Sequence, residues 1–184
     1  MTKQATVESI INQFTQLVME KDFIKLTVSE LCEATGISRN TFYKYFKDKN
    51  EIVEQILHRD IVIPMDELRK LYVSFELPST MILEWQYQQF YEQRKFYERI
   101  SAFTGQNSFY EFIMKHTSII IQEKIKPLQL PEKEQEYMVY FYASSHTMLL
   151  LKWIRDGMVQ KPKIMASYYE KWTIPIFQHY TQKR

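Results

Sequence analysis

The sequence predicts an all-α protein with a small N-terminal helical domain, residues 1–60, and a larger C-terminal helical domain, residues 61–184. Three observations lead to this prediction. The chain has only 3 glycines in 184 residues, against an average usage of about 7%. This scarcity excludes glycine-rich phosphate loops and disfavours all-β folds with their many tight turns. Apolar residues recur at helical spacing, and prolines and glycines divide the chain into segments of helix length.

The overall composition is that of an ordinary soluble globular protein, with 45% apolar and 25% charged residues. The single cysteine, Cys32, excludes an internal disulfide and a multi-cysteine zinc site, and it fits a reducing cytoplasm. The N-terminus has no long apolar stretch of the signal-peptide kind, and no aliphatic run is long enough to span a bilayer. We therefore expect a cytoplasmic protein with no membrane segment.

The first helix is predicted from a stripe of apolar residues that recur three and four positions apart. The break in this pattern at Asp22 and Phe23 ends the helix. The stripe consists of Val7, Ile10, Ile11, Phe14, Leu17 and Val18.

A second, shorter helix is predicted from its two end signals. Thr27 and Glu30 have the spacing of a capping box, in which each side chain accepts a hydrogen bond from the backbone of the other. Gly36 then supplies the left-handed conformation that closes a helix without steric penalty.

A third and a fourth helix follow at once. Ser38 is a good N-cap for a helix that runs through Tyr45 or Phe46. Asp48 begins the next helix, and Pro64 is expected to end or kink it.

The C-terminal part is predicted to contain six further helices, separated by proline and glycine residues. The high density of aromatic side chains in this part provides ample material for a core. The expected helices lie near residues 65–75, 79–93, 95–104, 107–126, 132–156 and 163–182.

The second and third helices, joined by a tight glycine turn, form a helix-turn-helix pattern. A second helix of about seven residues fits the DNA major groove, where its N-terminal side chains meet base edges. The stretch 39–49 holds four basic residues against Asp48 alone, a local charge of +3. Such a patch indicates phosphate contact, although a solvated helix face explains the charge alone equally well.

The residues from Thr27 to Leu31 and from Thr35 to Lys49 closely resemble the DNA-binding domain of the TetR family of transcriptional regulators. The resemblance covers about residues 6–58, and the run from Gly36 through Phe46 to Lys49 is its most distinctive part. The sequence departs from the family pattern at Cys32, where alanine is usual, and at Asp22, where glycine is common. Both residues are small or compatible with a turn, so the fold is not placed in doubt.

The resemblance implies an N-terminal three-helix DNA-binding domain and a C-terminal ligand and dimerisation domain. It also implies roles for individual residues. Phosphate contacts are expected from Thr27, Tyr43, Tyr45 and Lys49, and base contacts from Arg39, Asn40, Thr41 and Lys44, with Ser38 at the start of the reading helix. Core packing is the alternative for the two tyrosines, and it is the favoured role for Phe42 and Phe46.

In similar proteins the last two long helices pair with those of a second subunit. A dimer is also favoured because one helix-turn-helix makes too few contacts for tight specific binding, whereas two span half-sites about 34 Å apart. The stripes available for this pairing, which a purely internal core would also explain, are Tyr137, Phe141, Tyr142, Ser145, Met148, Leu149 and Trp153, and then Met165, Tyr168, Trp172 and Ile176.

A pocket for an apolar or aromatic small molecule is a weaker prediction. Aromatic side chains of the middle helices provide its walls and one histidine a polar group. The alternative is that these side chains fill a solid core. The candidate residues are Trp85, Phe90, Phe103, Phe112, Tyr142 and His146.

The sequence therefore predicts a transcriptional regulator, a homodimeric repressor that binds a palindromic DNA operator and is released by a ligand. A TetR-like co-activator that acts through a protein partner is the alternative. No catalytic motif is present, and the four histidines show no metal-ligand spacing. We accordingly expect no enzymatic activity, no metal and no cofactor.

Overall fold

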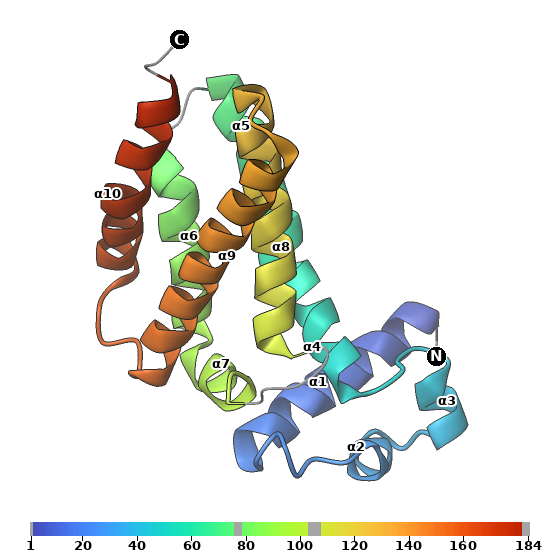
Figure 1. The fold of residues 1–184 in the computed structure, drawn as a ribbon. Helices are drawn as coiled ribbons and strands as arrows, with labels where there is room; N and C mark the ends of the chain where they lie inside the picture. Colours follow the sequence, from blue (N-terminus) through green and yellow to red (C-terminus); the bar gives the residue numbers. More distant parts are fainter. Residues whose placement is uncertain (1, 76–78, 103–107, 182–184) are drawn as a thin grey trace.

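A computed structural model describes residues 2–75, 79–102 and 108–181 of the chain. Within these ranges all regular secondary structure is helical, which confirms the predicted fold class. The helices of residues 3–57 form a small group at the N-terminal end, and the helices that follow form the rest of the molecule (Figure 1). None of the described helices has both the length and the apolar character needed to cross a membrane.

The N-terminal helices begin where local signals place them, but the third helix ends at Tyr43 and not at Tyr45 or Phe46 as predicted. Thr27 caps the second helix in a complete capping box with Glu30, and Gly36 closes it with φ of 68°. Ser38 caps the third helix by accepting a hydrogen bond from the Thr41 backbone. These helices are α1 (Lys3–Glu20), α2 (Val28–Thr35), α3 (Arg39–Tyr43) and α4 (Lys49–Leu57).

The prediction that Pro64 ends or kinks the fourth helix needs correction. After α4 the chain makes a π-helical turn, η1 (His58–Val62), and enters α5 (Ile63–Phe75) directly. The backbone N–H of Ile63 donates to the carbonyl of His58, the wider spacing of a π turn. Pro64 is therefore the second residue of a new helix, a position where its missing N–H is tolerated.

The C-terminal helices agree with the predicted segments to within a few residues, with one exception. The helix predicted near 95–104 ends at Ile100, and the last two residues of that predicted segment lie outside the described ranges. The elements are α6 (Ser79–Glu92), α7 (Arg94–Ile100), α8 (Phe109–Ile125), the 3-10 turn η2 (Lys126–Leu128), α9 (Glu132–Arg155) and α10 (Pro162–Thr181).

The long helices pack in two pairs. Helix α9 lies along α8, and helix α10 lies along α6, although α9 and α10 follow each other in the chain. One continuous apolar core extends from α1 to α10. The Phe14 ring of α1 meets the Phe96 ring of α7 edge-on at 6.4 Å, which ties the N-terminal helices to the rest of the molecule.

Candidate nucleic-acid interface

The helix-turn-helix is held by backbone and side-chain bonds within the motif. The Thr27 hydroxyl accepts from the Glu30 backbone at 3.3 Å, and a Glu30 carboxylate oxygen accepts from the Thr27 backbone at 2.9 Å. Lys21 binds the same carboxylate at 2.7 Å, and together these donors lower the pKa of Glu30 to about 2. The capping box therefore stays ionised at any physiological pH.

Helix α3 is anchored on its inner side by aromatic residues. Phe42 and Phe46 are fully buried, which confirms the core role predicted for both. On the same helix the Tyr43 ring meets Phe42 edge-on at 5.4 Å and is 56% exposed. The buried phenylalanines thus fix which face of α3 points to solvent.

The outer face of α3 carries the predicted base-reading residues. Arg39, Asn40 and Lys44 are exposed, and Thr41 is half-buried. The Thr41 hydroxyl shares a hydrogen bond of 2.9 Å with Ser38. Four of the predicted contact residues, Tyr43 included, therefore share one accessible, polar and basic surface with no acidic side chain among them.

Arg39 makes a contact that the sequence did not predict. Its guanidinium donates to the hydroxyl of Ser29, which lies on α2, so that the two helices of the motif are joined across their outer faces. In the sequence, Ser29 directly follows Val28, which is predicted to face inward at the start of the second helix. Nothing in the sequence paired it with Arg39, because that contact depends on the crossing of the two helices.

Lys49 is engaged inside the protein. Its ammonium group donates to the carbonyl oxygens of Phe23, Ile24 and Leu26 at 2.6, 2.9 and 2.8 Å, and it lies 4.7 Å from the centre of the Phe23 ring. Partial burial lowers the pKa of Lys49. An ammonium group has three N–H donors, and here all three have acceptors in the loop between α1 and α2.

The remaining predicted phosphate contacts occupy different environments. Thr27 is exposed at the N-terminus of α2, with its hydroxyl in the capping box. Tyr45 is half-buried and packs against the core just after α3 ends. The structure thus leaves Thr27 and Tyr43 accessible, whereas the Tyr45 ring serves the fold.

Two of the residues predicted to line a ligand pocket are buried against neighbouring rings. Phe90 packs against Tyr97, and Phe112 packs against His116, each within 5 Å between ring centres. Trp85 is half-buried, and Phe103 lies outside the described residues. These contacts are those of a packed core.

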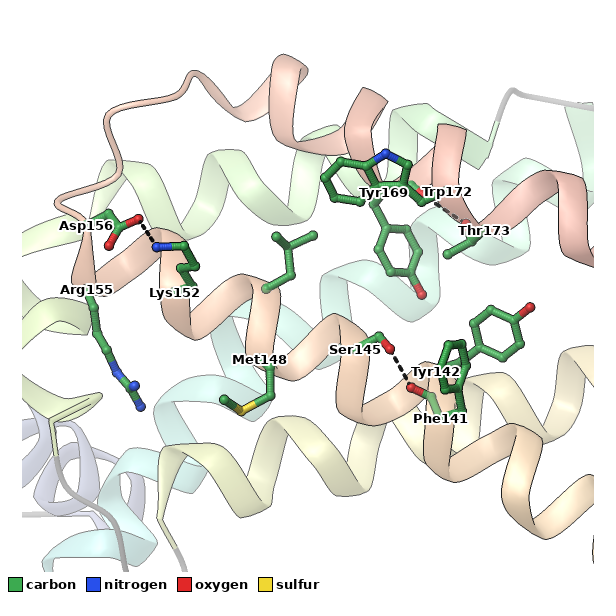
Figure 2. A pocket seen from close by; sticks show the side chains of 11 residues that line it. Phe141, Tyr142, Ser145, Met148, Lys152, Arg155, Asp156, Tyr169, Trp172 and Thr173 are labelled. Carbon is green, nitrogen blue, oxygen red and sulfur yellow. Dashed lines mark hydrogen bonds and ion pairs between the residues drawn. The ribbon is translucent and has the colours of Figure 1, made fainter.

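A cavity of about 730 Å³ lies elsewhere, between α9 and α10 (Figure 2). Tyr142 is the one member of the predicted set that lines it. His146 is buried nearby, with its ring edge-on to Tyr169 at 4.9 Å. Burial lowers the pKa of His146 to about 4, so the imidazole is neutral at physiological pH. Sequence reasoning missed this cavity because the α9 to α10 separation is a tertiary feature.

Among the described residues, no group of three or more histidine, cysteine, aspartate or glutamate side chains is placed to hold a metal ion.

Two family models match the chain. The model of bacterial regulatory proteins of the tetR family matches residues 10–56, the segment that contains α2 and α3. A model of a transcriptional regulator C-terminal region matches residues 81–173, about half of the chain. A comparison with curated proteins gives no match.

Two solved structures share the fold over nearly the whole chain. The dihydroxyacetone kinase operon activator DhaS is 18% identical, with a TM-score of 0.65, and the match covers 94% of this chain and 96% of that one. A protein from Syntrophomonas wolfei described as a TetR-family transcriptional regulator is 15% identical, with a TM-score of 0.67, and the match covers 94% and 97% of the two chains. At these identities the likeness concerns the fold alone.

Proposed function

The chain belongs to the TetR family of transcriptional regulators, and on that basis we propose that it is a homodimeric repressor that binds a palindromic operator and is released by a ligand. The observation that carries the proposal is the outer face of α3, where exposed Arg39, Asn40, Tyr43 and Lys44 project from a helix anchored by buried Phe42. A short helix held in this way presents its N-terminal side chains to the major groove.

The contact residues divide by chemistry. Arg39, Asn40, Thr41 and Lys44 read base edges, because a guanidinium suits guanine and a carboxamide suits adenine. Ser38 holds the start of the helix through its bond to the Thr41 backbone.

The phosphate contacts come from Thr27, Tyr43 and the hydroxyl of Tyr45. Thr27 stands at the N-terminus of α2, where backbone amides and the helix dipole attract an anion. Lys49 is left out of this set, because its three donors are bound to carbonyl oxygens of the loop after α1.

The dimer forms through α9 and α10. Large apolar side chains gather on these two helices at high exposure, among them Tyr137 at 70%, Phe141 at 59% and Trp172 at 57%. Apolar surface of this extent marks an interaction site. The interface also includes Tyr140, Met148, Ile164 and Tyr168.

Ligand release works by a shift between two dimer geometries with different spacing of the recognition helices. The change at the ligand site reaches the N-terminal helices through the contact between α8 and the π turn after α4. There His58 packs edge-on against Phe112 at 5.1 Å and His116 at 4.8 Å. The predicted boundary between the domains, at residue 60, lies within this turn. Binding to a bacterial operator places the protein in the cytoplasm.

A co-activator that works through a protein partner is the second candidate. One structural neighbour is an operon activator, and the exposed apolar face of α9 and α10 would suit a protein partner as well as a second copy. The two candidates differ in whether the purified protein alone binds DNA.

The test is a fluorescence anisotropy titration of the purified protein against its own upstream DNA and a scrambled duplex, at several salt concentrations. The proposal expects tight binding to the native fragment, with two subunits per site and a preference of at least about a thousandfold over the scrambled duplex. Weak binding to both duplexes with the same salt slope would overturn it and favour the co-activator.

A further inference from the structure

The cavity between α9 and α10 has the size of a small-molecule site. Its volume is about 730 Å³, within the range of about 300–1,000 Å³ typical of ligand pockets. It exists because α9 packs on α8 while α10 packs on α6, which leaves the facing sides of the two helices apart. Figure 2 shows the Tyr169 ring projecting from α10 toward α9 across this space.

The walls of the cavity are apolar and uncharged along most of its length. Tyr142, Leu149, Tyr169 and Trp172 provide flat or aliphatic surface. The hydroxyl of Ser145 already donates to the Phe141 carbonyl at 2.7 Å. These walls suit a flat apolar molecule rather than a chain of charged groups.

The charged lining residues all lie at one end, where α9 finishes. There Lys152 and Asp156 form an ion pair of 2.8 Å, so their charges compensate each other. Arg155 is the third charged residue of the lining. The central part of the cavity thus has no charge to offer to an ionic ligand.

In contact with the Tyr169 ring lies a buried polar group without a partner. The Nδ1 atom of His146 is buried and makes no hydrogen bond within the described structure, and the whole side chain is 4% exposed. Its ring is 4.9 Å from that of Tyr169. A buried imidazole nitrogen in this state is unfavourable unless a partner is supplied.

We propose that the α9–α10 cavity binds an uncharged, flat, apolar molecule with a single hydroxyl group. This hydroxyl pairs with that of Tyr169 and, after the Tyr169 ring turns aside, with Nδ1 of His146. A hydroxyl both donates and accepts, which matches a neutral imidazole beside a phenol. The inference rests on the proposed function, because it makes this molecule the effector that releases the operator.

The position of the cavity explains how such a ligand would act. Phe141, Met148 and Trp172 belong both to the cavity lining and to the exposed face assigned to the dimer. A second copy therefore roofs the cavity, and a molecule held there changes the angle between the subunits. That angle sets the distance between the two recognition helices.

The probe for the test is 1-naphthol, with naphthalene as the analogue that lacks the hydroxyl and 1-naphthoate as the charged analogue. Isothermal titration calorimetry on the full-length protein should give one 1-naphthol site per subunit. Naphthalene and 1-naphthoate should each bind about tenfold more weakly or worse. Equal affinity for all three would overturn the assigned chemistry.

Two substitutions locate the site. Tyr169→Phe should lower the affinity for 1-naphthol about tenfold and leave that for naphthalene unchanged. Ser145→Trp, at an exposed position of the lining, should abolish binding of both by filling the cavity, whereas Gln122→Trp on the exposed surface of α8 should not. If the partner's side chains fill the cavity, the dimer will bind no 1-naphthol, and the proposal fails.

Operator binding, measured on the same samples without 1-naphthol, separates the two proposals. Intact operator binding with no 1-naphthol site contradicts this inference alone. If the protein does not bind the operator, the proposed function is contradicted, whether or not the protein binds 1-naphthol. The combined account expects 1-naphthol to weaken operator binding at least about tenfold in the wild type, and expects Tyr169→Phe to need about tenfold more 1-naphthol for the same effect.

Discussion

The helix-turn-helix and the α9–α10 pair present opposite kinds of surface. The first exposes Arg39, Asn40 and Lys44, and its core beneath them contains buried phenylalanine side chains. The second exposes large aromatic side chains, such as Tyr137 at 70% and Trp172 at 57%. The first surface is suited to a charged, hydrated partner, and the second to an apolar one.

This difference shows where function lies in each half. In the N-terminal half, local bonds such as the capping box position polar side chains one by one. In the C-terminal half, the separation of two helices creates both an apolar face and a cavity. Substitutions in the N-terminal half should therefore affect single DNA contacts, and substitutions in the C-terminal half should affect the formation of the dimer.

The largest expected effect comes from placing charges on the apolar face. The double variant Phe141→Glu with Trp172→Glu should be monomeric, since both side chains are more than half exposed and neither supports the monomer core. A monomer reaches only one half-site, so operator affinity should fall about a thousandfold. Sedimentation velocity and anisotropy measure the two quantities.

Val159→Glu is the matched control, because Val159 is highly exposed but lies in the turn between α9 and α10. It should stay dimeric and bind the operator normally. A double variant that remains dimeric would show that the apolar face has another partner.

The next effect concerns the buried interior of the C-terminal half. His146 has a folded pKa of about 4, below the ordinary value of 6.5, so the unfolded chain takes up the proton first as the pH falls. Stability from this group is present above pH 6.5 and is lost as the pH falls toward 4, by about 3 kcal/mol in total. His146→Phe should flatten this pH dependence, as measured by urea unfolding, and an unchanged profile would contradict the burial.

A smaller effect tests the role of Lys49. Lys49→Met removes three hydrogen bonds to partly exposed loop carbonyls, and unfolding free energy should fall by about 1 kcal/mol. The slope of operator affinity against salt should not change, whereas loss of a phosphate contact reduces it by about one unit. Lys47→Met, at an exposed position, controls for the charge. If Lys49→Met reduces this salt slope and Lys47→Met does not, then Lys49 contacts a phosphate and the role assigned to it here is wrong.

The smallest effect is expected from Ser29→Ala, which tests the contact between the two helices of the motif and is compared with Arg39→Ala. Arg39→Ala should relax preference at one base pair by about 1–3 kcal/mol. Ser29→Ala should weaken that same preference only about threefold, because Arg39 keeps its charge but loses its anchor. Systematic substitution of operator base pairs measures both. An equal loss on every sequence would exclude Arg39 from base reading.

The fold was largely predictable because its signals are local. The capping box at Thr27, the glycine at 36 and the N-cap at Ser38 each act within four residues, and each lies where the sequence put it. Pro64 was misjudged because a π turn before it leads from α4 directly into α5, and no local signal in the sequence indicates that turn.

The candidate site was predictable only in part. Exposure of the outer face of α3 followed from the inward spacing of Phe42 and Phe46. The engagement of Lys49 did not, because its acceptors are more than twenty residues away in the chain. The cavity also escaped prediction, since aromatic spacing is the same in a packed core and in a cavity wall.

The most direct test of the central claim is a hydroxyl-radical footprint of the wild-type protein on its upstream DNA. The account predicts two symmetric protected half-sites about one helical turn, or about 34 Å, apart, with the protection lost in the double variant Phe141→Glu and Trp172→Glu. Uniform protection regardless of sequence, or no protection at all, would contradict the assignment of the α3 face as a paired DNA reader.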